Sequence, residues 1–159
     1  SAAAGSVWAP TNKFDRAPSW NSGSSGFMHG LPSDFLAVVQ PAVVPCRTNS
    51  VFEVASLDGT VFTTNQVYNL AEKFFLLSRP EIFGDWDSSS YKDGTQLEYY
   101  EGLTATERIK RDAAGSARGC WLRSPNPGNA NNERNVNTDG SVNNNNANNA
   151  NGVAPDCEK

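Results

Sequence analysis

A chain of 159 residues, 38% hydrophobic and 19% charged, has the size and composition of one globular domain, which excludes a chain disordered throughout. The formal net charge is −4, from 13 Lys and Arg against 17 Asp and Glu, and no dense basic cluster is present, so a nucleic-acid partner is excluded. No stretch approaches the ~20 apolar residues that span a bilayer, so membrane insertion is not expected either.

The N-terminal segment predicts an arm followed by a short helix. Residues 1–26 are rich in Ser, Ala, Gly, Pro and Asn, which is typical of an arm or linker, and residues 27–159 form the predicted domain. Apolar side chains within residues 31–40 predict a short helix with Ser33 as its N-cap. Pro41 ends this helix because a proline cannot continue the hydrogen-bond ladder.

Strand-forming residues dominate the next segment. Val43 and Val44, residues 51–57 and residues 60–64 are rich in β-branched and aromatic side chains, and each predicts a strand. Residues 58–59, Asp-Gly, form a turn dipeptide that joins the last two strands as a hairpin.

The middle of the chain contains two segments that predict the start of a helix. The apolar run 74–77 predicts a strand buried on both faces at the centre of the core, closed by a turn into a brief helix at residues 78–80. Thr104 and Glu107 have the spacing of a capping box, which predicts a helix over residues 104–111. The basic residues near the end of that segment are then expected on a solvated helix face.

Asparagine makes up half of residues 126–151. Composition alone favours a low-complexity, disordered tract, because Asn buries little apolar surface. The pattern within the tract favours an ordered hairpin instead, since polar and apolar residues alternate on both sides of Thr138-Asp139-Gly140.

The loop length of this hairpin decides which residues share a face. A three-residue loop with Gly140 in the left-handed conformation places Val136 opposite Val142, whereas a two-residue loop would put them on opposite faces. We therefore expect the three-residue loop, with the two valines on the apolar face of the hairpin that packs on the domain. Asn135, Asn137 and Asn143 are then expected to point outward.

The sequence gives little support for a catalytic or metal-binding site. His29 is the only histidine, and without a positioned partner it is expected to be structural. Asp85, Asp87, Ser89 and Asp93 begin like a calcium-binding loop, but two required positions are wrong: Ser90 replaces the glycine and Gln96 the bidentate glutamate. We expect a surface loop with no bound metal or cofactor.

The cysteines are scattered along the chain, at Cys46, Cys120 and Cys157. Their spacing does not fit a zinc knuckle, and an odd number leaves at least one thiol unpaired within the chain.

The segment after Gly119 is expected to supply the core residues on which the hairpin packs. Trp121, Leu122 and Pro125 are predicted to pack as core, and Arg123 between them to bridge backbone carbonyls of the following loops.

A series of motifs in fixed order resembles a known family. The chain resembles the C-type-lectin-fold variable proteins of diversity-generating retroelements, and equally the related phage and bacterial surface domains with the formylglycine-generating-enzyme type of this fold. The motifs are FMHGLP (27–32), FFLLS (74–78), EYYEG (98–102), ERIK (107–110), CWLRSP (120–125), RNVNTDGSVNNNNANNANG (134–152) and GVAP (152–155).

The resemblance implies an α+β, C-type lectin-like fold of loop-rich character, with short helices around small antiparallel sheets. It also implies a non-enzymatic domain whose C-terminal segment displays variable side chains to a ligand. Formylglycine-generating enzymes use a cysteine pair, and this chain has no two cysteines close together in sequence. The enzymatic activity is therefore not carried over.

Ligand-binding positions carried over from the family are all asparagines: Asn129, Asn131, Asn132, Asn135, Asn137, Asn143, Asn144, Asn145, Asn146, Asn148, Asn149 and Asn151. Two positions depart from the pattern, because Cys120 stands where an aromatic residue is common and Ala154 where an arginine is common. Packing under the display surface is expected to differ there.

The expected partner is a protein or glycan receptor on a cell surface, or other chains of a virion or surface structure. The expected location is extracellular, on a phage particle or a bacterial cell surface. The rival hypothesis is a structural decoration domain of a phage capsid or tail that has no dedicated ligand.

Overall fold

The fold is built from small sheets joined by short helices and long loops, as the sequence predicts for a loop-rich α+β protein. The computed structural model describes residues 13–14, 31–47, 54–56, 61–62, 66–87, 92–129 and 131–157. His29 and the 58–59 turn lie outside the described residues. Within the described part, no helix is long and apolar enough to cross a membrane.

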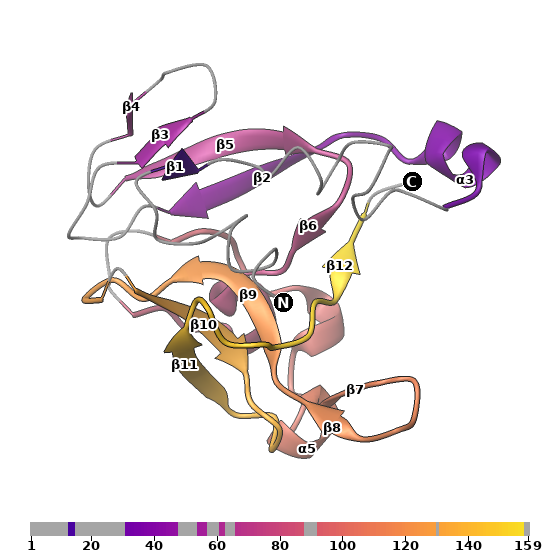
Figure 1. The fold of residues 1–159 in the computed structure, drawn as a ribbon, viewed down its shortest axis with the longest axis vertical. Helices are drawn as coiled ribbons and strands as arrows, with labels where there is room; N and C mark the ends of the chain where they lie inside the picture. The colour runs from indigo at the N-terminus through magenta and orange to yellow at the C-terminus, as the bar shows by residue number, and fades with distance from the viewer. Residues whose placement is uncertain are drawn as a thin grey trace.

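The first half of the chain forms two small sheets (Figure 1). In one of them β3 lies between β1 and β4, and β3 pairs with β4 in antiparallel register, which confirms the predicted hairpin. In the other, β2 and β5 pair antiparallel over their full lengths. The bounds are β1 (Lys13–Phe14), β2 (Ala42–Arg47), β3 (Val54–Ser56), β4 (Val61–Phe62) and β5 (Val67–Glu72). Because β1 pairs with β3, part of the predicted N-terminal arm contributes a strand.

The predicted first helix is present as α3 (Ser33–Val38), but its cap is not the expected one. Ser33 is the first helical residue, Pro32 occupies the N-cap position, and no side chain caps the helix. The predicted Ser33 cap is therefore wrong by one residue, and the chain leaves the helix at Val39, two residues before Pro41.

The buried run at residues 74–77 is confirmed as the centre of the core. Strand β6 (Phe75–Leu76) is buried on both sides, and β12 (Pro155–Asp156) pairs with it. Figure 1 shows β6 between the β2–β5 pair and the C-terminal sheet. The main cluster of buried residues gathers around it: Ala42, Val44, Cys46, Phe75, Leu77, Ile82, Tyr100, Leu122 and Val136.

Both predicted helix starts are confirmed. Helix α4 (Arg79–Phe83) begins at Ser78, whose hydroxyl accepts the amide of Glu81 while the Glu81 carboxylate accepts the amide of Ser78 at 2.8 Å. Helix α5 (Ala105–Arg108) begins at Thr104, which donates its amide to Glu107 at 2.8 Å. These reciprocal bonds satisfy backbone donors that an uncapped helix leaves open.

The predicted end of the second helix is wrong. The helix stops at Arg108, and β7 (Lys110–Arg111) pairs instead with β8 (Ala117–Arg118). The basic side chains do not all lie on a solvated face, because Arg108 sits over the ring of Phe83 and Lys110 donates to the Tyr100 hydroxyl.

The asparagine-rich segment is an ordered sheet in the order β11–β10–β9, so the hairpin prediction is confirmed. Its strands are β9 (Cys120–Pro125), β10 (Asn132–Val136) and β11 (Val142–Asn146). Every residue of β9 is buried, which confirms the predicted core role of Trp121, Leu122 and Pro125.

Candidate functional site

The hairpin loop has the geometry that the sequence predicts. Val136 pairs directly with Val142, and Asn137 donates its amide to the Ser141 carbonyl at 2.8 Å, which leaves three residues in the loop. Gly140 has φ +81°, a conformation that glycine adopts at little cost. The Asp139 carboxylate closes the loop by accepting the amide of Ser141 at 2.9 Å.

Contact with α5 holds the tip of the hairpin. A Cβ atom built on Gly140 would overlap the backbone carbonyl of Ala105, the first residue of that helix. The two backbones therefore approach each other so closely that only glycine fits at this position.

Asn135 does not point outward, so that part of the prediction is wrong. Strand β10 lies between β9 and β11, and its successive residues Asn135 and Val136, which point to opposite faces of the sheet, are both 0% exposed. Asn135 pairs with Trp121 of β9 and is 0% exposed, while Asn137 is half-buried and Asn143 is exposed. Residues outside the hairpin cover this face, since a Cβ atom built on Gly119 would lie 3.5 Å from the Asn135 amide nitrogen.

The other predicted ligand residues divide by exposure. Six asparagines are exposed and form what we call the asparagine surface: Asn129, Asn131, Asn143, Asn146, Asn148 and Asn149. Five are half-buried: Asn132, Asn137, Asn144, Asn145 and Asn151. All members of the asparagine surface except Asn143 lie toward the open end of the hairpin, where Ala147 donates its amide to the Asn131 carbonyl at 2.8 Å.

Some of these asparagines already serve the fold. Asn129 accepts the amide of Asn131 at 3.0 Å and so shapes the turn before β10. Asn144 accepts a bond from Arg134 at 2.9 Å. Within the described part of the chain, the side chains of the other five members of the asparagine surface make no hydrogen bond, so their amides face solvent.

A buried arginine–carboxylate network ties the hairpin to the rest of the molecule. Asp87 forms ion pairs with three arginines: Arg134 of β10 at 2.8 Å, Arg47 of β2 at 3.6 Å, and Arg79 of α4. Arg79 also binds Asp85 through two bonds of 2.9 and 3.0 Å. Such charge-assisted bonds are stronger and more directional than neutral ones, so they fix where β10 lies.

Arg123 is the second anchor of the sheet and is 2% exposed. Its guanidinium donates to the carbonyls of Pro45, Leu76 and Asp93 at 2.7 to 2.9 Å and pairs with the Glu81 carboxylate. The predicted bridging of carbonyls is confirmed, but these carbonyls belong to segments earlier in the chain, not to the loops that follow.

The acidic residues of the suspected calcium loop are engaged by protein groups. Asp85 and Asp87 bind arginines, and Asp93 is buried and accepts the Ser124 hydroxyl at 2.6 Å. Burial raises the pKa of Asp93, opposed by that hydrogen bond and by Arg123. Among the described residues, no group of three or more His, Cys, Asp or Glu is placed to hold a metal ion.

Glu133 is a buried carboxyl group without a hydrogen-bond partner. It is 2% exposed, and neither of its oxygens has a partner among the described residues. Burial raises its pKa well above the ordinary value, the Asp93 charge adds to that rise, and Arg47 opposes it.

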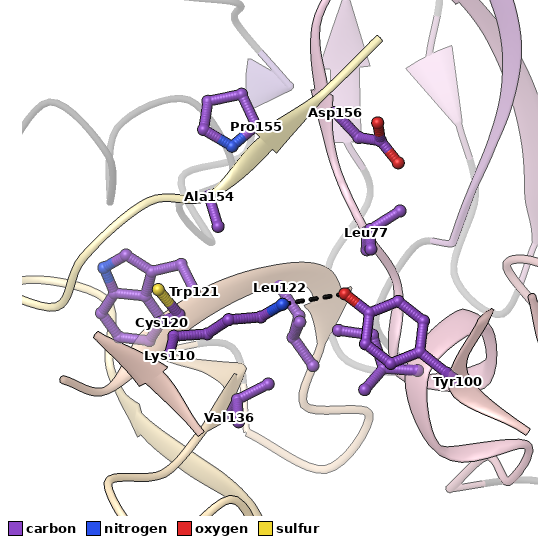
Figure 2. Close-up of a pocket in the computed structure, with 11 residues that line it drawn as sticks. Leu77, Tyr100, Lys110, Cys120, Trp121, Leu122, Val136, Ala154, Pro155 and Asp156 are labelled. Carbon is purple, nitrogen blue, oxygen red and sulfur yellow. Dashed lines mark hydrogen bonds between the residues drawn. The ribbon is translucent and has the colours of Figure 1, made fainter. Parts of the chain in front are cut away.

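A small pocket lies beside the hairpin, next to the segment that leads into β12 (Figure 2). It has a volume of about 210 Å³ and is lined by Leu77, Ile82, Tyr100, Lys110, Cys120, Trp121, Leu122, Val136, Ala154, Pro155 and Asp156. Both departures from the resembled family, Cys120 and Ala154, line this pocket. Burial raises the pKa of the Cys120 thiol, and the nearby Lys110 charge opposes that rise.

The sequence did not reveal this pocket, because its residues come from seven separated segments of the chain. The ERIK and EYYEG motifs supply its polar groups, Lys110 and Tyr100. Both motifs belong to the series that resembles the known family, and this was the sequence feature that could have drawn attention to the pocket residues.

No curated protein and no solved structure matches the chain. The family described as "Domain of unknown function (DUF6273)" matches residues 20–158, and the chain belongs to this family.

Proposed function

We propose that this chain is a non-enzymatic binding domain of the C-type lectin-like fold, in its formylglycine-generating-enzyme subtype. It presents the asparagine surface to a protein or glycan receptor on a cell surface, from a phage particle or a bacterial surface. The observation that carries the proposal is the contrast within the C-terminal sheet between exposed asparagine amides and a buried, ion-paired support beneath them.

The chemistry of asparagine fits this role. Each side chain offers two donors and one acceptor on a short stem, which suits sugar hydroxyls and peptide groups. Asn146, Asn148 and Asn149 follow one another around the turn after β11, where Asn149 donates its amide to the Asn146 carbonyl at 2.8 Å. A turn fixed in this way presents its amides at low entropic cost, which favours binding.

The same chemistry limits affinity. Hydrogen bonds from exposed amides replace bonds already made to water, and tight interfaces depend on buried Trp, Tyr or Arg. The asparagine surface with its present residues is therefore a weak binder. Its overall affinity for a receptor increases when several copies of the domain bind at the same time.

A display library tests the proposal. Tyrosine is allowed at Asn131, Asn143, Asn146, Asn148 and Asn149, and clones are selected on glycans and cell-surface proteins. Tyr adds contact area at low entropic cost, so we expect selectable binders with stability changes within about ±0.5 kcal/mol per site.

A matched library at Asn129, Asn135 and Asn144 is the control. These side chains are buried or hydrogen-bonded, so their Tyr variants should melt at lower temperature and yield no folded binders. Equal loss of folding in both libraries would make the exposed asparagines structural and would refute the display role. A well-folded first library from which no binder emerges would favour the decoration role.

A further inference from the structure

The pocket beside the hairpin combines an apolar floor with a polar end formed by Lys110 and Tyr100, and Asp156 lines it separately. Val136, Leu122 and Trp121 of the C-terminal sheet are almost completely buried and form part of its wall. Its volume of about 210 Å³ lies below the ~300–1,000 Å³ of pockets for drug-sized ligands, so its occupant must be small.

The polar end is a lysine with unused donors. Figure 2 shows the Lys110 ammonium pointing at the Tyr100 hydroxyl, to which it donates at 2.8 Å. Lys110 is half-buried, and no carboxylate of the described residues lies within 4.0 Å of it. The ammonium also lies 5.1 Å from the centre of the Tyr100 ring. An ammonium has three donors, so among the described residues its one hydrogen bond to a neutral hydroxyl leaves two donors unused and the charge without a carboxylate partner.

Small side chains keep the space beside this lysine open. Cys120 and Ala154 both line the pocket, and neither is long enough to reach across it. Asp156 also lines it, but Asp156 is exposed and its carboxylate accepts the amide of Cys157 at 2.8 Å. The one half-buried charge in the wall is therefore positive.

We infer that this pocket binds a small monocarboxylate with an apolar body, of the size of benzoate. The carboxylate accepts bonds from the Lys110 ammonium and the Tyr100 hydroxyl, and the apolar body packs against Trp121 and Leu122. A buried ion pair of this kind is specific because the wrong ligand would leave the lysine charge unpaired. The site is separate from the asparagine surface, and it stands or falls independently of the proposed function.

Calorimetric titration of the full 159-residue chain at pH 8 tests this inference with three probes of one shape. Benzoate should bind with a millimolar or tighter dissociation constant and at least tenfold more tightly than benzyl alcohol. Benzylammonium should not bind. Benzylammonium binding tighter than benzoate would overturn the inference, because Asp156 would then be the recognising group.

Variants locate the site. Lys110→Met keeps the aliphatic stem and should weaken benzoate binding at least tenfold. Lys73→Met is the matched control, because Lys73 is also half-buried and donates to a backbone carbonyl, of Leu36 at 3.0 Å, away from the pocket. It should leave benzoate binding unchanged.

A second variant keeps the test independent of folding. Ala154 is exposed and lines the pocket, so the larger side chain of Ala154→Leu should reduce the space for benzoate and abolish its binding while leaving the melting temperature nearly unchanged. Benzoate affinity that survives Ala154→Leu, or that falls equally in Lys110→Met and Lys73→Met, would place the ligand elsewhere and refute the inference.

Discussion

Asp87 and Glu133 are both shielded from solvent, yet they are in opposite electrostatic situations. Asp87 forms ion pairs with three arginines. Glu133 has no hydrogen-bond partner for either oxygen among the described residues, and the nearby Asp93 disfavours its charge further. The surroundings of Glu133 therefore favour its neutral form, whereas Asp87 is the centre of an ion-pair network.

This difference predicts how stability depends on pH. The folded-state pKa of Glu133 is raised above its ordinary value of 4.5, so the folded protein holds a proton that the unfolded chain has released. The associated stability is fully present below pH 4.5 and is lost as the pH rises toward the folded pKa. The raised pKa of Asp93 acts in the same direction. Urea unfolding from pH 4.5 to 8 should show a falling free energy of unfolding.

Glu133→Gln isolates the contribution of this residue. The neutral amide has nearly the same shape and does not titrate, so the variant should lose less stability than the wild type between pH 4.5 and 8. Glu101→Gln, at an exposed glutamate, is the control and should follow the wild-type curve. Parallel curves for wild type and Glu133→Gln would mean that Glu133 is charged in the folded protein.

Among the elements, the hairpin tip and α5 stabilise each other through backbone contact. Gly140 and Gly115 have nearly the same left-handed backbone, with φ of +81° and +82°. They differ in surroundings, since a Cβ on Gly140 would overlap the Ala105 carbonyl, whereas a Cβ on Gly115 would have no neighbour within 4 Å.

The two glycines therefore separate backbone strain from packing. Gly115→Ala should cost about 1–2 kcal/mol, the penalty for a side chain in the left-handed region. Gly140→Ala should cost roughly 3 kcal/mol or more, because the clash adds to the same penalty. Thermal unfolding of both variants measures the difference. Equal losses would show that the hairpin tip is free to move away from α5.

Elements set by local chemistry were predictable, and elements set by distant partners were not. The capping boxes at Ser78 and Thr104 and the three-residue loop at Gly140 depend on residues within a few positions, and the structure has all three. The end of α5 depends on the pairing of β7 with β8, and the burial of Asn135 depends on residues outside the hairpin, such as Gly119. The hairpin pattern contains no information about what packs over its second face, so it placed Asn135 outside.

For the whole molecule, Arg123 is the residue that connects the sheets of the two halves of the chain. Its guanidinium bonds to backbone carbonyls of β2 and β6, to the carbonyl of Asp93, and to the Glu81 carboxylate of α4. One residue of β9 therefore joins the N-terminal and C-terminal sheets through the centre of the fold. The asparagine surface rests on the same sheet, so its geometry depends on this junction.

Removing this junction should destabilise the entire domain. Arg123→Met leaves the buried Glu81 carboxylate without its cationic partner and removes the guanidinium donor of three carbonyls, and breaking a buried pair from one side costs about 3–5 kcal/mol. For a chain of this size that corresponds to a fall in melting temperature of roughly 10 °C.

Arg118→Met is the matched control, because it removes an arginine–aspartate pair of 2.8 Å in which Arg118 is largely exposed. Such pairs contribute about 0–1 kcal/mol. Adding Glu81→Gln to Arg123→Met should recover part of the loss, since the unpaired charge is then gone while the amide oxygen can still accept the Ser78 amide. A melting temperature for Arg123→Met close to that of Arg118→Met would show that the two sheets are held together mainly by apolar packing around β6.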